Sequence, residues 1–573
     1  MTRGASPRRL GPGLLAVIVA IALAAAPPVA PVARAATPDL TIVGDARYEV
    51  VPEESLVRVT VDLVARNHLR DTAARKFYFD RAFLAVPPGT TSFKLTSPSG
   101  KPSVRVSSRR ADHQILALSF GQRIAAGKSA KLRLTFNLPD PGGAAARDVR
   151  VGAALVTFPA WAYGYPNGVA GSSVTAVFPA GYTAYLEAGE LRAPTNDAAG
   201  RTIFASGPLA DATGFSAYFV AERPVAHVET QLDIVIGGST APVTIRAWPD
   251  DPDWAARVGD LFERGLPVLG DLTGLGWERT GPLVVEEAVS RSGAGHAALF
   301  DPAAGRMGLA YYADSSVVLH EAAHAWFNGA LLADRWANEA FASYYAVAAG
   351  GRLDEAIAPA ELTDELMKVR IPLNSWAAGE SDGYAYAASY TLAARVAERA
   401  GFEGLREVWR AAAAGEAAYQ PAHVDAGAAR PPETVAGAPD WRGLLDLLED
   451  RTGESYDDLW REWVVRDDEA KLLQARTGAR ERYAAVVRSA GRWELPRSVR
   501  DALRAWQFEE ARAMLVDAEE LLVRRAELEG AAADAGLRLP TRLEAAFEGA
   551  AGFAAAKAEA EAEKAMIAAL LAA

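Results

Sequence analysis

The hydrophobic pattern changes once along the chain, from an alternation typical of strands to a spacing typical of helices. Between about Asp39 and Ile245, apolar and polar residues alternate in short runs, for example over 56–63 and 131–136, and Gly, Pro and Ser separate the runs. Runs of this kind at short spacing predict strands that each bury one face. We therefore predict an all-β sandwich domain over residues 36–246.

Helical periodicity begins after Trp248 and dominates the rest of the chain. Residues 255–269 carry apolar side chains at intervals of three and four, which predicts an amphipathic helix. Two strand-like runs and two more helices are expected next, at 283–285, 307–312, 314–326 and 334–351. We predict an α+β domain, a linker with completing helices, and an α-helical C-terminal region, over residues 247–415, 416–470 and 471–573.

The first 35 residues have the composition of a secretory signal peptide. They contain four arginines and no acid, an apolar run over 14–26, and a small-residue site at 33–35. The apolar run is too short for a membrane span, so we predict cleavage, a secreted or extracytoplasmic protein and no transmembrane span in the mature chain. Attachment to a cell surface stays open.

Charge and cysteine content narrow the function further. Lys and Arg number 60 against 72 Asp and Glu, and loss of the four N-terminal arginines takes the formal net charge from −12 to −16. Such an acidic chain is not expected to bind nucleic acid as its main partner. Because the chain has no Cys, any metal must be held by His, Asp or Glu.

One pentapeptide in the expected helix at 314–326 carries metal chemistry. His320 and His324 are four residues apart, so their imidazoles stack on one helical face and can bind one Zn²⁺ together. Glu321 lies beside them, where a carboxylate can act as general base toward a water that the metal activates. A catalytic zinc needs a third protein ligand. Glu339, near the start of the next helix, is the favoured candidate, and Asp334 is the competitor, although it suits a helix N-cap better.

Segments 320–327 (HEAAHAWF) and 338–342 (NEAFA) together resemble the HExxHxWF and NExFA patterns of the aminopeptidase N family of gluzincin zinc metallopeptidases. The resemblance implies a β-sandwich, a thermolysin-like catalytic domain over 247–415 and a helical domain after it. It implies one Zn²⁺ per chain, held by His320, His324 and Glu339, with Glu321 as general base. A family Tyr assists the oxyanion, and Tyr386 aligns best with it. Tyr384 stays open as an alternative.

Two departures from the family pattern affect the expected activity. The spacer from Ala325 to Asn338 is shorter than the family's by about one helical turn, which puts Ser343 at the family's own ligand spacing. No GxMEN-type segment is visible: the corresponding region, 292–298, is Gly-rich and has no acid to bind a substrate α-amine. Glu286 and Glu287 lie nearby as substitutes for that acid, or as ordinary acids at a strand end.

These patterns predict a secreted, zinc-dependent metallopeptidase that hydrolyses peptide bonds in a peptide or protein substrate. The resemblance favours an aminopeptidase over an endopeptidase. The alternative is a non-catalytic, zinc-containing binding or scaffold protein with a degenerate peptidase domain. Neither the oligomeric state nor the role of 471–573 follows from the sequence.

Overall fold

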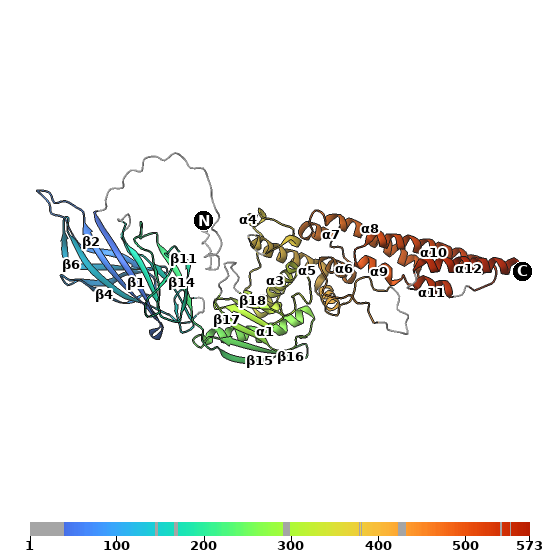
Figure 1. Ribbon diagram of the computed structural model, residues 1–573, viewed down its shortest axis with the longest axis horizontal. Helices are drawn as coiled ribbons and strands as arrows, with labels where there is room; N and C mark the ends of the chain where they lie inside the picture. The colour runs from blue at the N-terminus through green and yellow to red at the C-terminus, as the bar shows by residue number, and fades with distance from the viewer. Residues whose placement is uncertain are drawn as a thin grey trace, which may run out of the picture.

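The computed structural model describes residues 39–143, 147–164, 170–289, 298–377, 379, 381–421, 431–538, 541–549 and 552–572. β-Sheets, a mixed α/β region and a helical region follow one another along its long axis (Figure 1). This order confirms the predicted fold class. The predicted signal peptide lies outside the described residues. Within the described ranges, no helix is both long and apolar enough to cross a membrane.

Three sheets make up the N-terminal region. Seven strands lie in the order β12-β13-β10-β1-β2-β7-β4, four in the order β11-β14-β9-β8, and three in the order β3-β6-β5. The strands are β1 (Leu40–Val51), β2 (Leu56–Asn67), β3 (Tyr78–Val86), β4 (Thr91–Thr96), β5 (Ser103–Arg109), β6 (Gln114–Ala125), β7 (Ser129–Pro139), β8 (Arg150–Val151), β9 (Leu155–Trp161), β10 (Ser173–Phe178), β11 (Thr183–Ala188), β12 (Thr195–Asn196), β13 (Thr202–Ala205) and β14 (Ser216–Glu222).

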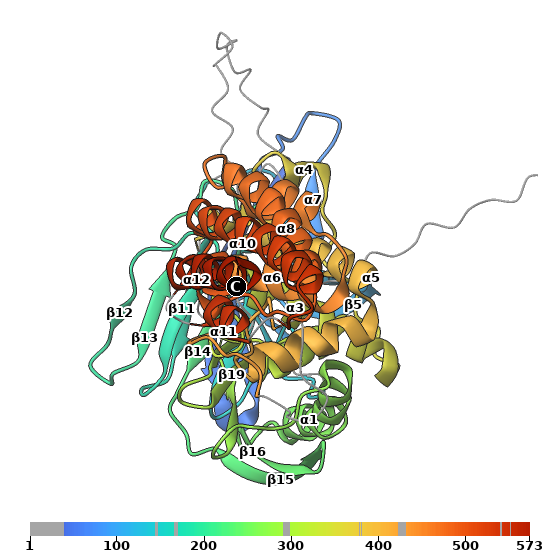
Figure 2. The same cartoon turned by 90° about the vertical axis from the view of Figure 1, so that its right-hand side faces the viewer.

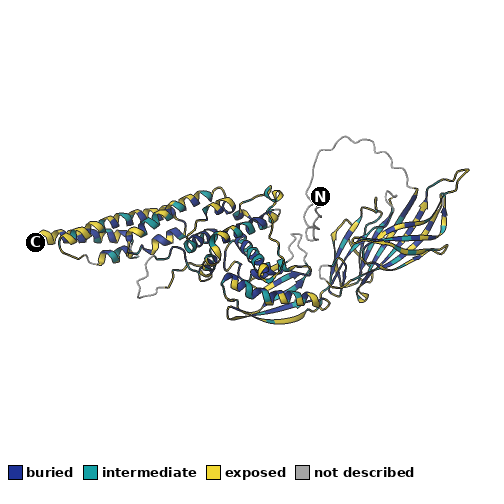
Figure 3. Cartoon of the chain, turned by 180° about the vertical axis from the view of Figure 1, so that it is seen from behind, coloured by how far each residue is buried: buried dark blue, intermediate teal, exposed yellow. Residues whose placement is uncertain are grey.

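The alternation read in the sequence buries one face of these sheets. In β2, which pairs with β1 on one side and β7 on the other, Val57, Val59 and Val61 are fully buried. They share one core with residues of the four-stranded sheet, and the Tyr48 ring on β1 stacks on Phe158 of β9 at 5.9 Å between centroids. Buried positions accordingly alternate with exposed ones along the strands (Figure 3).

The middle region is built on a five-stranded sheet in the order β15-β16-β17-β19-β18. Its strands are β15 (Val228–Ile236), β16 (Ser239–Ala247), β17 (Leu283–Ala288), β18 (Ala298–Asp301) and β19 (Arg306–Ala310), and helix α1 (Pro252–Thr273) packs on β15 and β16. The sheets therefore divide between β14 and β15, not at the boundary drawn at 246/247. Alternation is the same in either sheet, so periodicity alone assigned β15 and β16 to the sandwich.

Helices make up most of the remaining described residues. Those of the middle region are α2 (Ser315–Ala323), α3 (Arg335–Leu353), α4 (Asp364–Met367), α5 (Asp382–Ala413), α6 (Trp441–Thr452) and α7 (Asp457–Leu459). The tail holds α8 (Ala470–Ala490), α9 (Arg497–Arg504), α10 (Phe508–Asp534), α11 (Arg542–Glu548) and α12 (Phe553–Ala572), seen end-on in Figure 2. Leu473, Leu503 and Phe508 from this tail pack in the same core as the middle region. Farther along α10, Leu515 and Leu521 belong to a separate tail core.

A buried charge cluster joins the sandwich to the middle region. Arg150 of β8 is fully buried, 2.7 Å from the carboxylate of Asp251 and 3.4 Å from that of Glu287 on β17. The rings of Trp248 and Tyr311 flank its guanidinium. The Arg150 guanidinium lies within ion-pair distance of two buried carboxyl groups, and its single charge cannot neutralise both. Burial accordingly raises the pKa of Glu287 to about 9, although Arg150 and the Trp248 N–H oppose the shift.

Candidate metal centre

Helix α2 presents the two histidines. The Asp314 carboxylate caps its start by accepting the Val317 N–H at 3.1 Å. The helix was expected to reach Trp326 but ends at Ala323, with His324 at the C-cap. Asn328 explains the early end, because its side-chain amide donates to the carbonyls of His324 (2.9 Å) and Ala325 (3.2 Å), which leave the helical ladder.

A short connection then turns the chain back so that α3 faces α2. Glu339 lies in the second turn of α3, and its Oε2 is 3.2 Å from Nε2 of His320 and 3.5 Å from Nε2 of His324. The two Nε2 atoms are 3.1 Å apart. The three donor atoms thus form a nearly equilateral triangle. The arrangement forms despite the shortened spacer.

The triangle has the dimensions of a zinc site. Zn–N and Zn–O bonds of about 2.0–2.1 Å in tetrahedral geometry separate neighbouring donor atoms by about 3.3 Å, close to the observed 3.1–3.5 Å. Among the described residues, this is the group of His and carboxylate side chains close enough together to hold a metal ion. Two imidazoles and one carboxylate also suit Zn²⁺ chemically.

Both imidazoles are oriented by contacts to Nδ1, the ring nitrogen that does not face Glu339. Nδ1 of His324 lies 2.7 Å from the Phe327 carbonyl oxygen and must donate to it. Nδ1 of His320 lies 3.2 Å from Oγ of Ser343, one turn beyond Glu339 on α3. When Nδ1 carries the only proton of the ring, each Nε2 can offer its lone pair to a metal ion, as a ligand must. Ser343, which stands at the family's own ligand spacing, thus contacts a candidate ligand from behind and does not face the metal group itself.

The charges within the group are strongly coupled. Burial by itself would raise the pKa of Glu339, but hydrogen bonds with His320 and His324 outweigh it and hold that pKa well below its usual range. Burial likewise opposes protonation of His324, yet contact with Glu339 raises the pKa of this imidazole. Glu339 is therefore an anion at every physiological pH, ready to serve as a ligand.

Glu321 and Tyr386 line the same cavity as the three donors. The cavity encloses about 480 Å³, and its wall includes His320, Glu321, Glu339 and Tyr386. The Tyr386 hydroxyl on α5 accepts a hydrogen bond from Arg335 at 3.4 Å. Burial and the charge of Glu339 raise the pKa of Tyr386 to about 12, so the hydroxyl keeps its proton. Tyr384 is fully buried and is not part of this wall.

No family model and no curated protein matches the chain. Solved structures do. An M1 zinc metallopeptidase from Deinococcus radiodurans is 16% identical over 74% of this chain and 94% of its own, with a TM-score of 0.31. A variant of such an enzyme bound to a Tyr-Ser-Ala substrate, also from Deinococcus radiodurans, is 18% identical over 75% and 95%, with a TM-score of 0.30. A two-domain M1 variant bound to L-arginine is 18% identical over 75% and 94%, with a TM-score of 0.32.

The chain resembles M1 zinc metallopeptidases. The donor group that the gluzincin resemblance predicted is confirmed, because His320, His324 and Glu339 lie close enough together to hold one metal ion. The roles of individual residues are argued below from the contacts within the site.

Asp334 has another partner than the metal group. It occupies the N-cap position of α3 but makes no side-chain cap, and its carboxylate accepts the backbone N–H of Trp441 at 2.5 Å. Asp334 therefore fixes the start of α3 against the start of α6. Of the two candidate third ligands, Glu339 is the one that lies beside the two histidines.

The acids suggested as amine anchors are engaged elsewhere. Glu287 belongs to the Arg150 cluster and accepts the Trp248 N–H at 2.9 Å. Glu286 forms ion pairs with Arg246 and Arg306. Neither lines the cavity. The Gly-rich segment expected near the substrate lies outside the described residues except for Ala298.

Two further hollows lie outside the metal group. One of about 670 Å³, walled by Trp277 and Trp326, shares Pro302, Asn328 and Gly329 with the cavity of the histidines, so the two adjoin.

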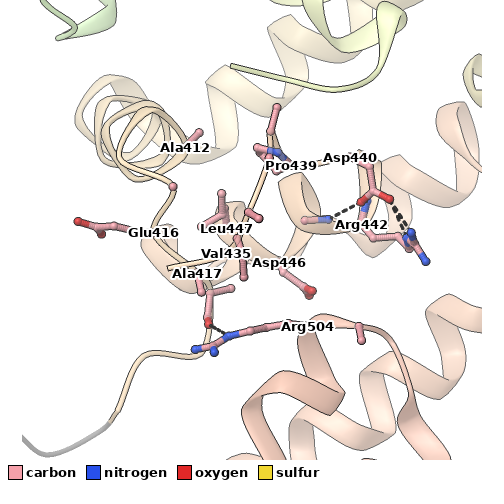
Figure 4. Close-up of a pocket in the computed structure, with 17 residues that line it drawn as sticks. Ala412, Glu416, Ala417, Val435, Pro439, Asp440, Arg442, Asp446, Leu447 and Arg504 are labelled. Carbon is pink, nitrogen blue, oxygen red and sulfur yellow. Dashed lines mark hydrogen bonds and ion pairs between the residues drawn. The ribbon is translucent and has the colours of Figure 1, made fainter. Parts of the chain in front are cut away.

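The other hollow, of about 290 Å³, lies among α5, α6 and α9 (Figure 4). Polar groups around it bind one another: Arg504 donates to the Ala418 carbonyl at 2.9 Å, and Asp440 pairs with Arg442 at 2.7 Å.

Proposed function

We propose that this chain is an exported zinc-dependent metallopeptidase. The supporting observation is the triangle of His320, His324 and Glu339 donor atoms, with Glu321 and Tyr386 in the same cavity wall. When bound there, Zn²⁺ would supply Lewis-acid charge that polarises a carbonyl and lowers the pKa of water to about 7. The M1 relatives bound to an amino acid or a peptide are consistent with this reading.

The chain's own residues would divide the proton transfers and the charge stabilisation. Glu321, only 8% exposed, takes the proton of the attacking water and passes it to the leaving amine. Tyr386 keeps its proton and donates a hydrogen bond to the oxyanion of the tetrahedral intermediate. His320, His324 and Glu339 stay fixed throughout, because Ser343, the Phe327 carbonyl and the α2–α3 turn hold them.

The experiment exposes the zinc-loaded mature protein to a mixed peptide library and maps each cut by mass spectrometry. Glu321→Gln is the matched control: it should retain zinc, measured by elemental analysis, and lose hydrolysis by several orders of magnitude. Stepwise loss of N-terminal residues would establish the aminopeptidase mode that the resemblance favours, and internal cuts an endopeptidase.

Absence of any cut above the Glu321→Gln control, with zinc bound, would favour the zinc-containing scaffold instead. Export has its own test. The secreted protein should begin at or near Ala36, which N-terminal sequencing of material from the medium or periplasm decides.

A further inference from the structure

Arg335 gives the cavity a positive charge that the catalytic roles above do not use. It is the one Lys or Arg among the described residues of the cavity wall, where the other charged residues are Glu321, Glu339 and the two histidines. Bound Zn²⁺ would balance the two carboxylates. The guanidinium then leaves an excess positive charge facing the substrate.

The position of Arg335 is fixed by the helix that carries Glu339. Arg335 is the first residue of α3, four residues before Glu339, so the two side chains share one face about 6 Å apart along the axis. An extended peptide advances about 3.3–3.6 Å per residue. The guanidinium is therefore within reach of a group one or two residues from the scissile bond.

Aromatic contacts hold the guanidinium in the cavity. It lies 4.4 Å from the centroid of the Trp376 ring, which is itself tethered by a 2.7 Å hydrogen bond from its Nε1 to Asp382. One nitrogen donates to the Tyr386 hydroxyl. In the described part of the chain no carboxylate forms an ion pair with Arg335. Four of its five N–H donors stay available, in the fork geometry that matches a carboxylate.

We propose that Arg335 is a specificity-determining residue that binds a carboxylate of the substrate within two residues of the scissile bond. This inference rests on the proposed peptidase function. Two sources have the required chemistry: the C-terminal carboxylate of a short peptide, and the side chain of an Asp or Glu. Either forms charge-assisted hydrogen bonds with the guanidinium fork.

The test uses two matched pairs of peptides with wild-type protein, Arg335→Gln and Arg335→Lys. Ala-Ala-Ala against its C-terminal amide probes the terminal carboxylate, and Ala-Glu-Ala-amide against Ala-Gln-Ala-amide probes the side chain. Wild type should cleave the carboxylate member of at least one pair with about 10–100-fold higher kcat/KM, the range of a hydrogen bond to a charged group. Arg335→Gln should remove that preference through KM, and Arg335→Lys should restore part of it.

The ratio within a pair separates substrate binding from an effect through Tyr386. Loss of the Tyr386 contact would lower kcat for both members of a pair alike and leave the ratio unchanged. An unchanged ratio in Arg335→Gln, or no carboxylate preference in wild type, would overturn the inference.

Binding distinguishes this inference from the peptidase proposal. In zinc-loaded Glu321→Gln protein, calorimetry should show tighter binding of Ala-Ala-Ala or Ala-Glu-Ala-amide than of its partner, and the added Arg335→Gln change should abolish the difference. Arg335-dependent binding without cleavage by wild type would refute the peptidase and keep the carboxylate site. Cleavage with Arg335-independent binding would do the opposite.

Discussion

Glu287 should make the junction between the sandwich and the middle region sensitive to pH. The Glu287→Gln change keeps the shape of the side chain and an oxygen for the Trp248 N–H, but it cannot ionise. In the wild-type fold Glu287 has a pKa of about 9, against 4.5 for an unburied Glu. Between these values the folded chain holds a proton that the unfolded chain has released.

The sign and size of the effect follow from that raised pKa. The stability contributed by the neutral carboxyl is fully present below about pH 4.5 and is lost as pH rises toward 9. Its maximum slope is about 1.4 kcal/mol per pH unit for one proton. From about pH 5 to pH 7 the free energy of unfolding of wild type should therefore fall by about 3 kcal/mol relative to that of Glu287→Gln.

The assay is urea unfolding of both proteins at about pH 5, 6, 7 and 8, followed by tryptophan fluorescence. The matched control is Glu286→Gln on the same strand. That carboxylate is partly exposed and pairs with Arg246 and Arg306, so Glu286→Gln controls for the loss of a carboxylate that lies outside the buried cluster. A flat difference between wild type and Glu287→Gln would refute the reasoning. A rising one would mean that the ion pair with Arg150 outweighs burial.

Two further predictions concern the metal centre. Tyr386→Phe should lower kcat by about 10–1,000-fold with little change in KM, because it removes the hydrogen bond to the oxyanion. An unchanged kcat would remove Tyr386 from the oxyanion role. Ser343→Ala removes the hydroxyl that contacts Nδ1 of His320, so it should weaken zinc binding about tenfold or more in chelator competition. Ser343→Thr keeps the hydroxyl and should preserve the affinity. Equal zinc affinities in wild type and both variants would show that Ser343 does not support His320.

Local spacing predicted the centre of the site, and contacts between distant segments determined the rest. His320 and His324 follow from the period of one helix, and Glu339 from a short turn between two. Tyr384 and Tyr386 are two residues apart, about 200° around a helix, so one had to face the cavity and the other the core. Which of them faces which way depends on how α5 packs against α3, and no local pattern contains that.

The sequence spacing also indicated that Arg335 and Ser343 belong to the site, although neither residue is part of the metal-binding motif. With Glu339 they form an i, i+4, i+8 series, so all three lie on the face of α3 that is turned toward the histidines. No local pattern could assign β15 and β16 to the middle sheet, because that assignment depends on the pairing of β16 with β17, which is distant in the sequence. The early end of α2 also escaped the pattern, since it depends on the side chain of Asn328.

Helix α10 couples the tail mechanically to the middle region. It begins at Phe508 inside the core that surrounds the metal centre and continues into the tail core at Leu515 and Leu521. Its 27 residues make a rod about 40 Å long. A continuous helix packed in two cores has no hinge at their junction, so a force on the far end of the tail reaches the middle region as torque. A fragment cut at residue 470 would likewise expose the apolar surface that Leu473, Leu503 and Phe508 cover. A stable fragment that contains the metal centre therefore has to extend into α10.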